Sequence, residues 1–159
     1  MTSHISARAV LAGAALLFAA SSATADDDEF FPPVTDPLTR EECSACHMAY
    51  PASMLPRRSW RAIMDGLEDH FGEDASLDPQ ATAHIREWLQ ANAADSGGRR
   101  PWILRGLGAD ETPLRISELP KMVREHRGEV SRRQLQKAGS MSNCNACHVG
   151  AESGFFEDD

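Results

Sequence analysis

The sequence has few basic residues and few large apolar residues, and both shortages limit what the protein can be. Its 159 residues hold 16 Lys and Arg against 24 Asp and Glu, a net charge of −8. This argues against nucleic acid as a partner, because phosphate binding needs a basic surface. From Asp26 onward, only 32 of 134 residues are Val, Ile, Leu, Met, Phe, Trp or Tyr. So few large apolar residues make a thin core, because the burial of apolar surface must offset a conformational entropy cost of about 1.5 kcal/mol for each residue that folds. We therefore expect another component to fill part of the interior.

Long apolar runs are absent except for one near the N-terminus, from Ala9 to Ala20. Arg8 precedes this run, Ala23-Thr24-Ala25 follows it as a small-x-small cleavage pattern, and residues 1–25 contain no acidic residue. These features predict a secretory signal peptide that is cleaved after residue 25. The run is too short to cross a bilayer, which needs about 20 apolar residues. We therefore expect a periplasmic mature chain without a transmembrane segment.

Charge divides the mature chain unevenly. Residues 26–96 have a net charge of −10 and residues 97–137 a net charge of +5. The sign changes within the Gly-rich segment 95–101, which ends in proline and is typical of a surface loop. We therefore expect two modules, 26–96 and 97–159, packed against each other. The short acidic tail, Val149–Asp159, is expected to be poorly ordered.

Helical spacing recurs along the chain, whereas no segment alternates apolar and polar residues long enough to predict a strand. Four segments carry helix signals. They are a capping box at Thr39–Glu42, an apolar stripe from Trp60 to Phe71 that ends at Gly72, a helix start at Asp78-Pro79, and a stripe from Leu119 to Val130. The predicted fold class is all-α, with short helices and long loops.

Two copies of the pattern C-x-x-C-H are the strongest signal in the sequence. They are Cys43-Ser44-Ala45-Cys46-His47 and Cys144-Asn145-Ala146-Cys147-His148. Two thiols at this spacing can add to the two vinyl groups of one porphyrin, and the adjacent histidine can then bind the iron. The motifs therefore predict two covalently attached haem c groups, held by Cys43, Cys46, Cys144 and Cys147 with His47 and His148 on the irons. Two such apolar plates would also explain the thin core.

Other uses of four cysteines explain the pattern less well. A thiol–disulfide redox pair normally sits in a βαβ context, which is missing here. A zinc module would not place 97 residues between the two cysteine pairs. Structural disulfides suit an exported protein, but they need no histidine directly after the second cysteine.

The second axial ligand of each iron must come from elsewhere in the chain. No histidine or methionine follows His148, so the second haem needs an upstream ligand, and His126 lies in the middle of the Leu119–Val130 stripe. Neutral imidazole is a common metal ligand, and apolar surroundings favour its neutral form. For the first haem the spacing leaves several candidates open. They are His70, His84, Met48, Met54 and Met64.

These residues together resemble the small periplasmic dihaem cytochrome c family (the DHC type). The matching blocks are Glu42–Pro51, Leu55-Pro56, Ser59-Trp60, Asp69-His70-Phe71-Gly72, Arg115-Ile116-Ser117, Glu125-His126 and Asn143–His148. They cover most of residues 38–148. The resemblance implies two histidines on each iron, with His70 distal at the first haem and His126 distal at the second. His84 has no counterpart and is expected to lie beside solvent. Crossed ligation, with His70 serving the second haem, stays open.

An iron bound by two histidines has no open site, and imidazole in place of methionine lowers its reduction potential. We therefore expect a low-potential electron-transfer protein rather than an enzyme. Its partners would be redox proteins: another cytochrome or haem protein, with a membrane cytochrome as one candidate donor. The alternative is a ligand-binding sensor or a peroxidase-like protein with one five-coordinate haem.

Basic side chains have two expected uses. Some of the ten basic residues in 97–137 would pair with haem propionates, or the segment would form a docking patch for a redox partner. Arg57, Arg58 and Arg61, near the first motif, are further candidates for the propionates.

Overall fold

The computed structural model describes residues 30–98 and 101–157, and the predicted signal peptide lies outside them. Five α-helices follow one another within these described residues. They are α1 (Pro37–Cys43), α2 (Arg57–Asp65), α3 (Pro79–Ala91), α4 (Pro120–Glu125) and α5 (Arg132–Ala138). Single turns of 3-10 helix lie at Ala52–Met54, Leu67–Asp69, Trp102–Leu104, Ile116–Glu118, Cys144–Ala146 and Ala151–Ser153. The described residues form no β-strand beyond two isolated bridges, so the all-α prediction is confirmed. None of their helices is long and apolar enough to span a membrane.

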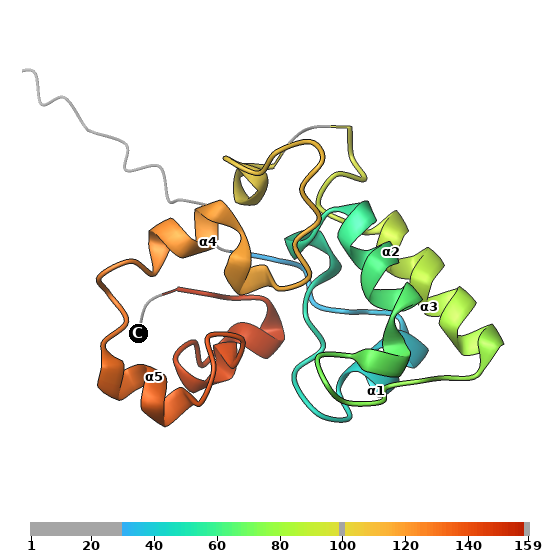
Figure 1. The fold of residues 1–159 in the computed structure, drawn as a ribbon, viewed down its shortest axis with the longest axis horizontal. Coiled ribbons are helices and arrows are strands. Elements are labelled where there is room, and N and C mark those ends of the chain that lie inside the picture. Colours follow the sequence, from blue (N-terminus) through green and yellow to red (C-terminus); the bar gives the residue numbers. More distant parts are fainter. Residues whose placement is uncertain (1–29, 99–100, 158–159) are drawn as a thin grey trace, which may run out of the picture.

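The helices form two groups, with α1, α2 and α3 together and α4 and α5 apart from them (Figure 1). In the first group α2 packs along α3, and their facing sides bury Trp60, Met64, Ile85 and Leu89. The indole N–H of Trp60 donates to the carbonyl of Ala52 at 2.7 Å. Buried apolar side chains therefore stabilise the group formed by α1, α2 and α3.

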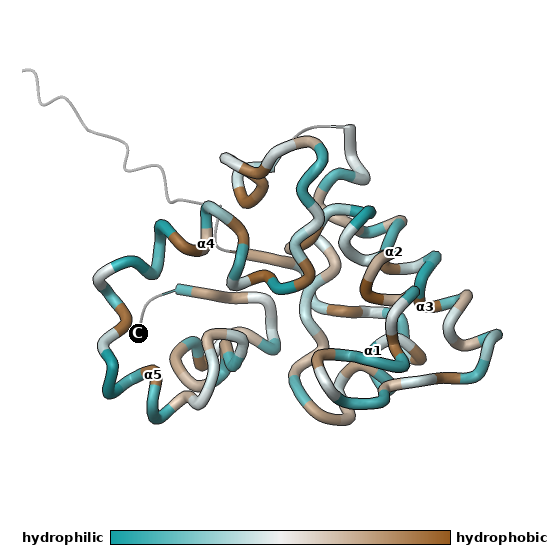
Figure 2. The backbone as a smooth tube through the Cα atoms, in the orientation of Figure 1, coloured by the Kyte–Doolittle hydropathy of each residue, from teal (hydrophilic) through white to brown (hydrophobic). Residues whose placement is uncertain are grey.

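The segment around α4 and α5 has almost no core of its own. No residue from 120 to 150 is buried. The backbone from the end of α4 through α5 is mostly hydrophilic in Figure 2. Helices this short are not stable alone in water, so a partner must hold them. This agrees with the expectation that a component other than side chains fills part of the interior.

The predicted start of α3 is confirmed, whereas the predicted start of the first helix is wrong. Asp78 caps α3 by accepting from two backbone N–H groups, with Pro79 at the first helical position. Asp36, rather than Thr39, caps α1: its carboxylate accepts from the Thr39 backbone N–H and hydroxyl, both at 2.8 Å. A carboxylate is a preferred N-cap acceptor, and Thr39 lies one turn inside the helix.

The second and fourth predicted helices are shorter than expected. Helix α2 ends at Gly66, not Gly72, and Phe71 lies beyond it with φ of 60° and 45% of its surface exposed. Helix α4 ends before Val130. Leu67 packs against the core from the single turn beyond α2, whereas Phe71 is exposed, so an apolar stripe can continue past the end of its helix.

Helix α5 was not predicted. It has a capping box between Ser131 and Gln134 but no buried residue, so apolar spacing gives little signal of it.

The C-terminal tail is folded over residues 149–157, contrary to the prediction of poor order for Val149–Asp159. The N–H of Phe31 donates to the carbonyl of Gly154 at 2.8 Å, and the Phe30 ring contacts that of Phe155 at a tilt of 48°, with 4.9 Å between ring centres. Phe156 meets the buried Phe31 ring edge-on at 5.7 Å. The start of the described chain therefore holds its end, and the aromatic residues of the tail supply the contacts.

Candidate functional site

One large cavity connects the two groups of helices. Its volume is about 1570 Å³, more than the 300–1,000 Å³ of a typical small-molecule site. All eight predicted attachment and ligand residues line it. They are Cys43, Cys46, His47, His70, His126, Cys144, Cys147 and His148. Residues that lie up to 105 positions apart in the sequence therefore share a single, mostly apolar space.

Each cysteine motif begins at a helical turn. Cys43 is the last residue of α1, and Cys144 opens a single 3-10 turn. Burial raises the pKa of the Cys43 thiol to about 11, with the Glu42 carboxylate adding to the effect, and burial also raises the pKa of Cys144. A redox-active thiol has the opposite shift, since its reactivity depends on a lowered pKa.

The other uses of the cysteines find no support in their geometry. The four cysteines, all in the described part of the chain, form no disulfide. Among residues 30–98 and 101–157, no three His, Cys, Asp or Glu side chains gather as a metal-binding group. A zinc centre and a pair of disulfide staples therefore do not fit this arrangement.

The imidazoles meet in two pairs. The ring centres of His47 and His70 are 6.2 Å apart with planes at 29°, and those of His126 and His148 are 6.1 Å apart with planes at 90°. An imidazole nitrogen lies about 2 Å from a metal ion that it binds, so two imidazoles on opposite sides of one ion hold their centres about 6 Å apart. Both pairs have the spacing that two imidazoles on one metal ion would need, and in each pair a motif histidine meets the histidine that the family resemblance assigns to the same haem.

Hydrogen bonds orient three of the four imidazoles. The Nδ1 atom of His47 lies 2.7 Å from the carbonyl oxygen of Met48, that of His126 2.9 Å from Met122, and that of His148 3.1 Å from Glu157. A carbonyl oxygen only accepts, so Nδ1 is the donor in each case and Nε2 keeps the lone pair that a metal needs.

The chain brings His70 and His126 into place by ending helices early. His126 is the C-cap of α4, and its backbone N–H still bonds the carbonyl of Met122. His70 follows the single turn after Gly66 and pairs with Glu73 across a tight turn, its N–H donating at 2.8 Å. Burial lowers the pKa of His70, with the charges of His47 and Arg115 adding to the effect, and this favours the neutral imidazole that binds metals.

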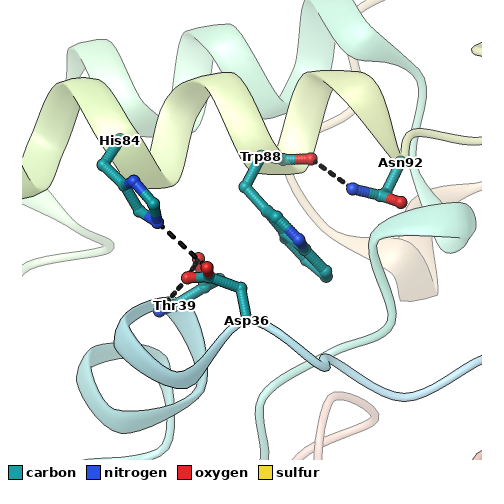
Figure 3. A network of polar contacts seen from close by, with 5 residues as sticks. All are labelled: Asp36, Thr39, His84, Trp88 and Asn92. Carbon is teal, nitrogen blue, oxygen red and sulfur yellow. Dashed lines mark hydrogen bonds and ion pairs between the residues drawn. The ribbon is translucent and has the colours of Figure 1, made fainter.

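The other candidate ligands of the first haem have different surroundings. His84 is half exposed and binds the Asp36 carboxylate at 3.0 Å, at the start of α1 (Figure 3). Met54 and Met64 are buried in the protein core, although both also line the cavity. Met48 does not line the cavity. The expectation that His84 lies beside solvent is confirmed.

The arginines near the first motif do not line the cavity. Arg57 and Arg58 donate to backbone carbonyls at residues 96, 108 and 111, and Arg61 is exposed. Their pairing with haem propionates stays a prediction. Among the described basic residues, Arg115 and Lys137 line the cavity. Both belong to the basic segment 97–137, and spacing alone could not single them out.

Comparisons with known proteins agree with this geometry. A family model described as dihaem cytochrome c matches residues 39–156. A diheme cytochrome c structure from Rhodobacter sphaeroides is 63% identical, covers 79% of this chain and 99% of its own, and gives a TM-score of 0.74. A diheme cytochrome type c from Shewanella baltica OS155 is 43% identical. The match covers 76% of this chain and 86% of the Shewanella chain, with a TM-score of 0.62. No curated protein matches the sequence.

Proposed function

Because the chain belongs to the dihaem cytochrome c family and carries two haem c groups, we propose that it is a low-potential electron-transfer protein with two histidines on each iron. His47 and His70 would bind the first iron, and His148 and His126 the second. The spacing of the two imidazole pairs, 6.2 and 6.1 Å, is the observation that carries the proposal. Haem iron supplies reversible one-electron chemistry when bound.

The residues of the chain would attach, orient and shield the two groups. The four thiols along the cavity provide the attachment points, and the Nδ1–H bonds fix three of the imidazoles. Filling both axial positions leaves no site for oxygen, nitric oxide or peroxide, so the protein would carry electrons rather than act as an enzyme. Imidazole in place of methionine would keep both potentials low.

The setting of this function is inferred from the sequence. The signal-peptide pattern of residues 1–25 supports export to the periplasm. Redox partners would be another cytochrome or haem protein, and a membrane cytochrome is a candidate donor. The acidic segment 26–96 would favour a basic surface on a redox partner, and the basic segment 97–137 would favour an acidic one.

Absorption spectra and a redox titration of the haem-loaded protein test the proposal. We expect low-spin bands from both haems, no change when carbon monoxide is added to the reduced protein, and two potentials below those of cytochromes with methionine ligands. His70→Ala should open one haem to carbon monoxide, whereas the control His84→Ala should not. Carbon monoxide binding by the unmodified protein would instead favour the sensor or peroxidase alternative.

A further inference from the structure

Tyr50, the single tyrosine of the chain, contacts the first cysteine motif and the backbone just before the second. Its ring lies against the imidazole of His47, with centres 4.9 Å apart and planes at 28°. Its hydroxyl donates to the backbone carbonyl of Ser142 at 2.5 Å. Ser142 lies 92 positions further along the chain and two residues before Cys144. One half-buried side chain thus joins the ligand of the first haem to the attachment site of the second.

We propose that Tyr50 is a positioning residue that sets the plane of the His47 imidazole and ties it to the second haem motif. This inference rests on the proposed ligation of the first iron by His47. The hydrogen bond from Nδ1 to Met48 fixes the direction of one ring edge. This hydrogen bond still allows the His47 ring to rotate about the line from Nδ1 to the Met48 oxygen. The Tyr50 ring, which lies nearly parallel to the imidazole, restricts that rotation.

The orientation of the imidazole matters for the electronic state of the iron. The planes of His47 and His70 are 29° apart, whereas those of His126 and His148 are 90° apart. Nearly parallel ligand planes separate the energies of the two iron d orbitals that interact with the rings, and perpendicular planes leave them nearly equal. The first haem should therefore give a rhombic low-spin electron paramagnetic resonance (EPR) spectrum, and the second a strongly anisotropic one.

The hydroxyl of Tyr50 has a separate task. Residues 120–150 bury none of their own side chains, so few contacts fix this segment against the first group of helices. The bond from Tyr50 to Ser142 is one such contact, and it acts on the backbone beside Cys144. Removing the hydroxyl should loosen this connection while the stacked ring stays in place.

Three variants of the haem-loaded protein separate the two tasks. In Tyr50→Leu, which removes the stacked ring, we expect the rhombic signal of the first haem to shift and broaden while the second signal is unchanged. Tyr50→Phe should keep both signals but unfold at a lower denaturant concentration than the unmodified protein. Ser142→Ala, the matched control, keeps the carbonyl acceptor and loses only the 3.5 Å contact between its hydroxyl and that of Ser117. It should leave both signals unchanged and lower the unfolding midpoint less than Tyr50→Phe does.

Two results would overturn the proposal. An unchanged first-haem signal in Tyr50→Leu would refute the role in orienting His47, and an unchanged unfolding midpoint in Tyr50→Phe would refute the tie to Ser142. Should Tyr50→Leu fail to retain haem, Tyr50→Met tests the same point with a longer side chain. A high-spin signal in the unmodified protein would count against the proposed ligation itself, so the two failures are distinguishable.

Discussion

Replacing Gly154 by alanine should detach the C-terminal tail. Gly154 has φ of 89°, and a Cβ atom there would lie 2.2 Å from the carbonyl oxygen of Phe31. The left-handed conformation costs alanine about 1–2 kcal/mol. Relieving the clash must also break the bond from the Phe31 N–H to the Gly154 carbonyl, which contributes about 1 kcal/mol. We expect Gly154→Ala to lower the free energy of unfolding by about 2–3 kcal/mol, measured by guanidinium denaturation of the haem-loaded protein.

Gly128→Ala is the matched control. Gly128 has φ of 88°, but a Cβ atom there would meet no atom within 4 Å, so only the conformational cost of about 1–2 kcal/mol applies.

The tail also supports His148, since Phe156 lies 5.9 Å from its ring and the Glu157 carbonyl accepts from Nδ1. Gly154→Ala should therefore also alter the EPR signal of the second haem, and Gly128→Ala should not. Equal losses of stability with unchanged spectra would refute this reasoning.

Three further predictions follow from the site and its supports. His126→Ala should leave a high-spin fraction at the second haem that binds carbon monoxide, while His84→Ala leaves both haems low-spin in the same absorption assay. A backbone N–H bond at the start of α1, helped by His84, lowers the pKa of Asp36 below its ordinary 3.8. The contribution of Asp36 to the free energy of unfolding is present above pH 3.8 and is lost as the pH falls through the lowered pKa of the folded protein. Asp36→Asn should therefore flatten the acid side of a curve of stability against pH. Changing Cys144 and Cys147 to serine should remove most of the helical circular dichroism of α4 and α5, because those helices bury no side chains of their own; an unchanged spectrum would contradict this.

The motifs and the overall class of the fold could be read from the sequence because their signals are local. The C-x-x-C-H pattern needs only five residues, and Asp78-Pro79 marks a helix start through its own hydrogen bonds and fixed φ. His126 stood out because it lies among apolar residues. These features depend on neighbours in sequence.

Features that depend on distant contacts could not be read in this way. Periodicity did not separate His70 from His84, because α2 ends at Gly66 and the turn that carries His70 is irregular. Only the family resemblance pointed to His70. Helix α5 and the ordered tail were missed for a similar reason: one borders the cavity, and the other is held by Phe31 from the opposite end of the chain.

We propose that each iron lies between two imidazoles, one pair nearly parallel and the other perpendicular. EPR of the frozen, oxidised protein tests it most directly. We expect two low-spin signals of equal intensity, one rhombic and one strongly anisotropic. A high-spin signal that accounts for one haem per chain would contradict it.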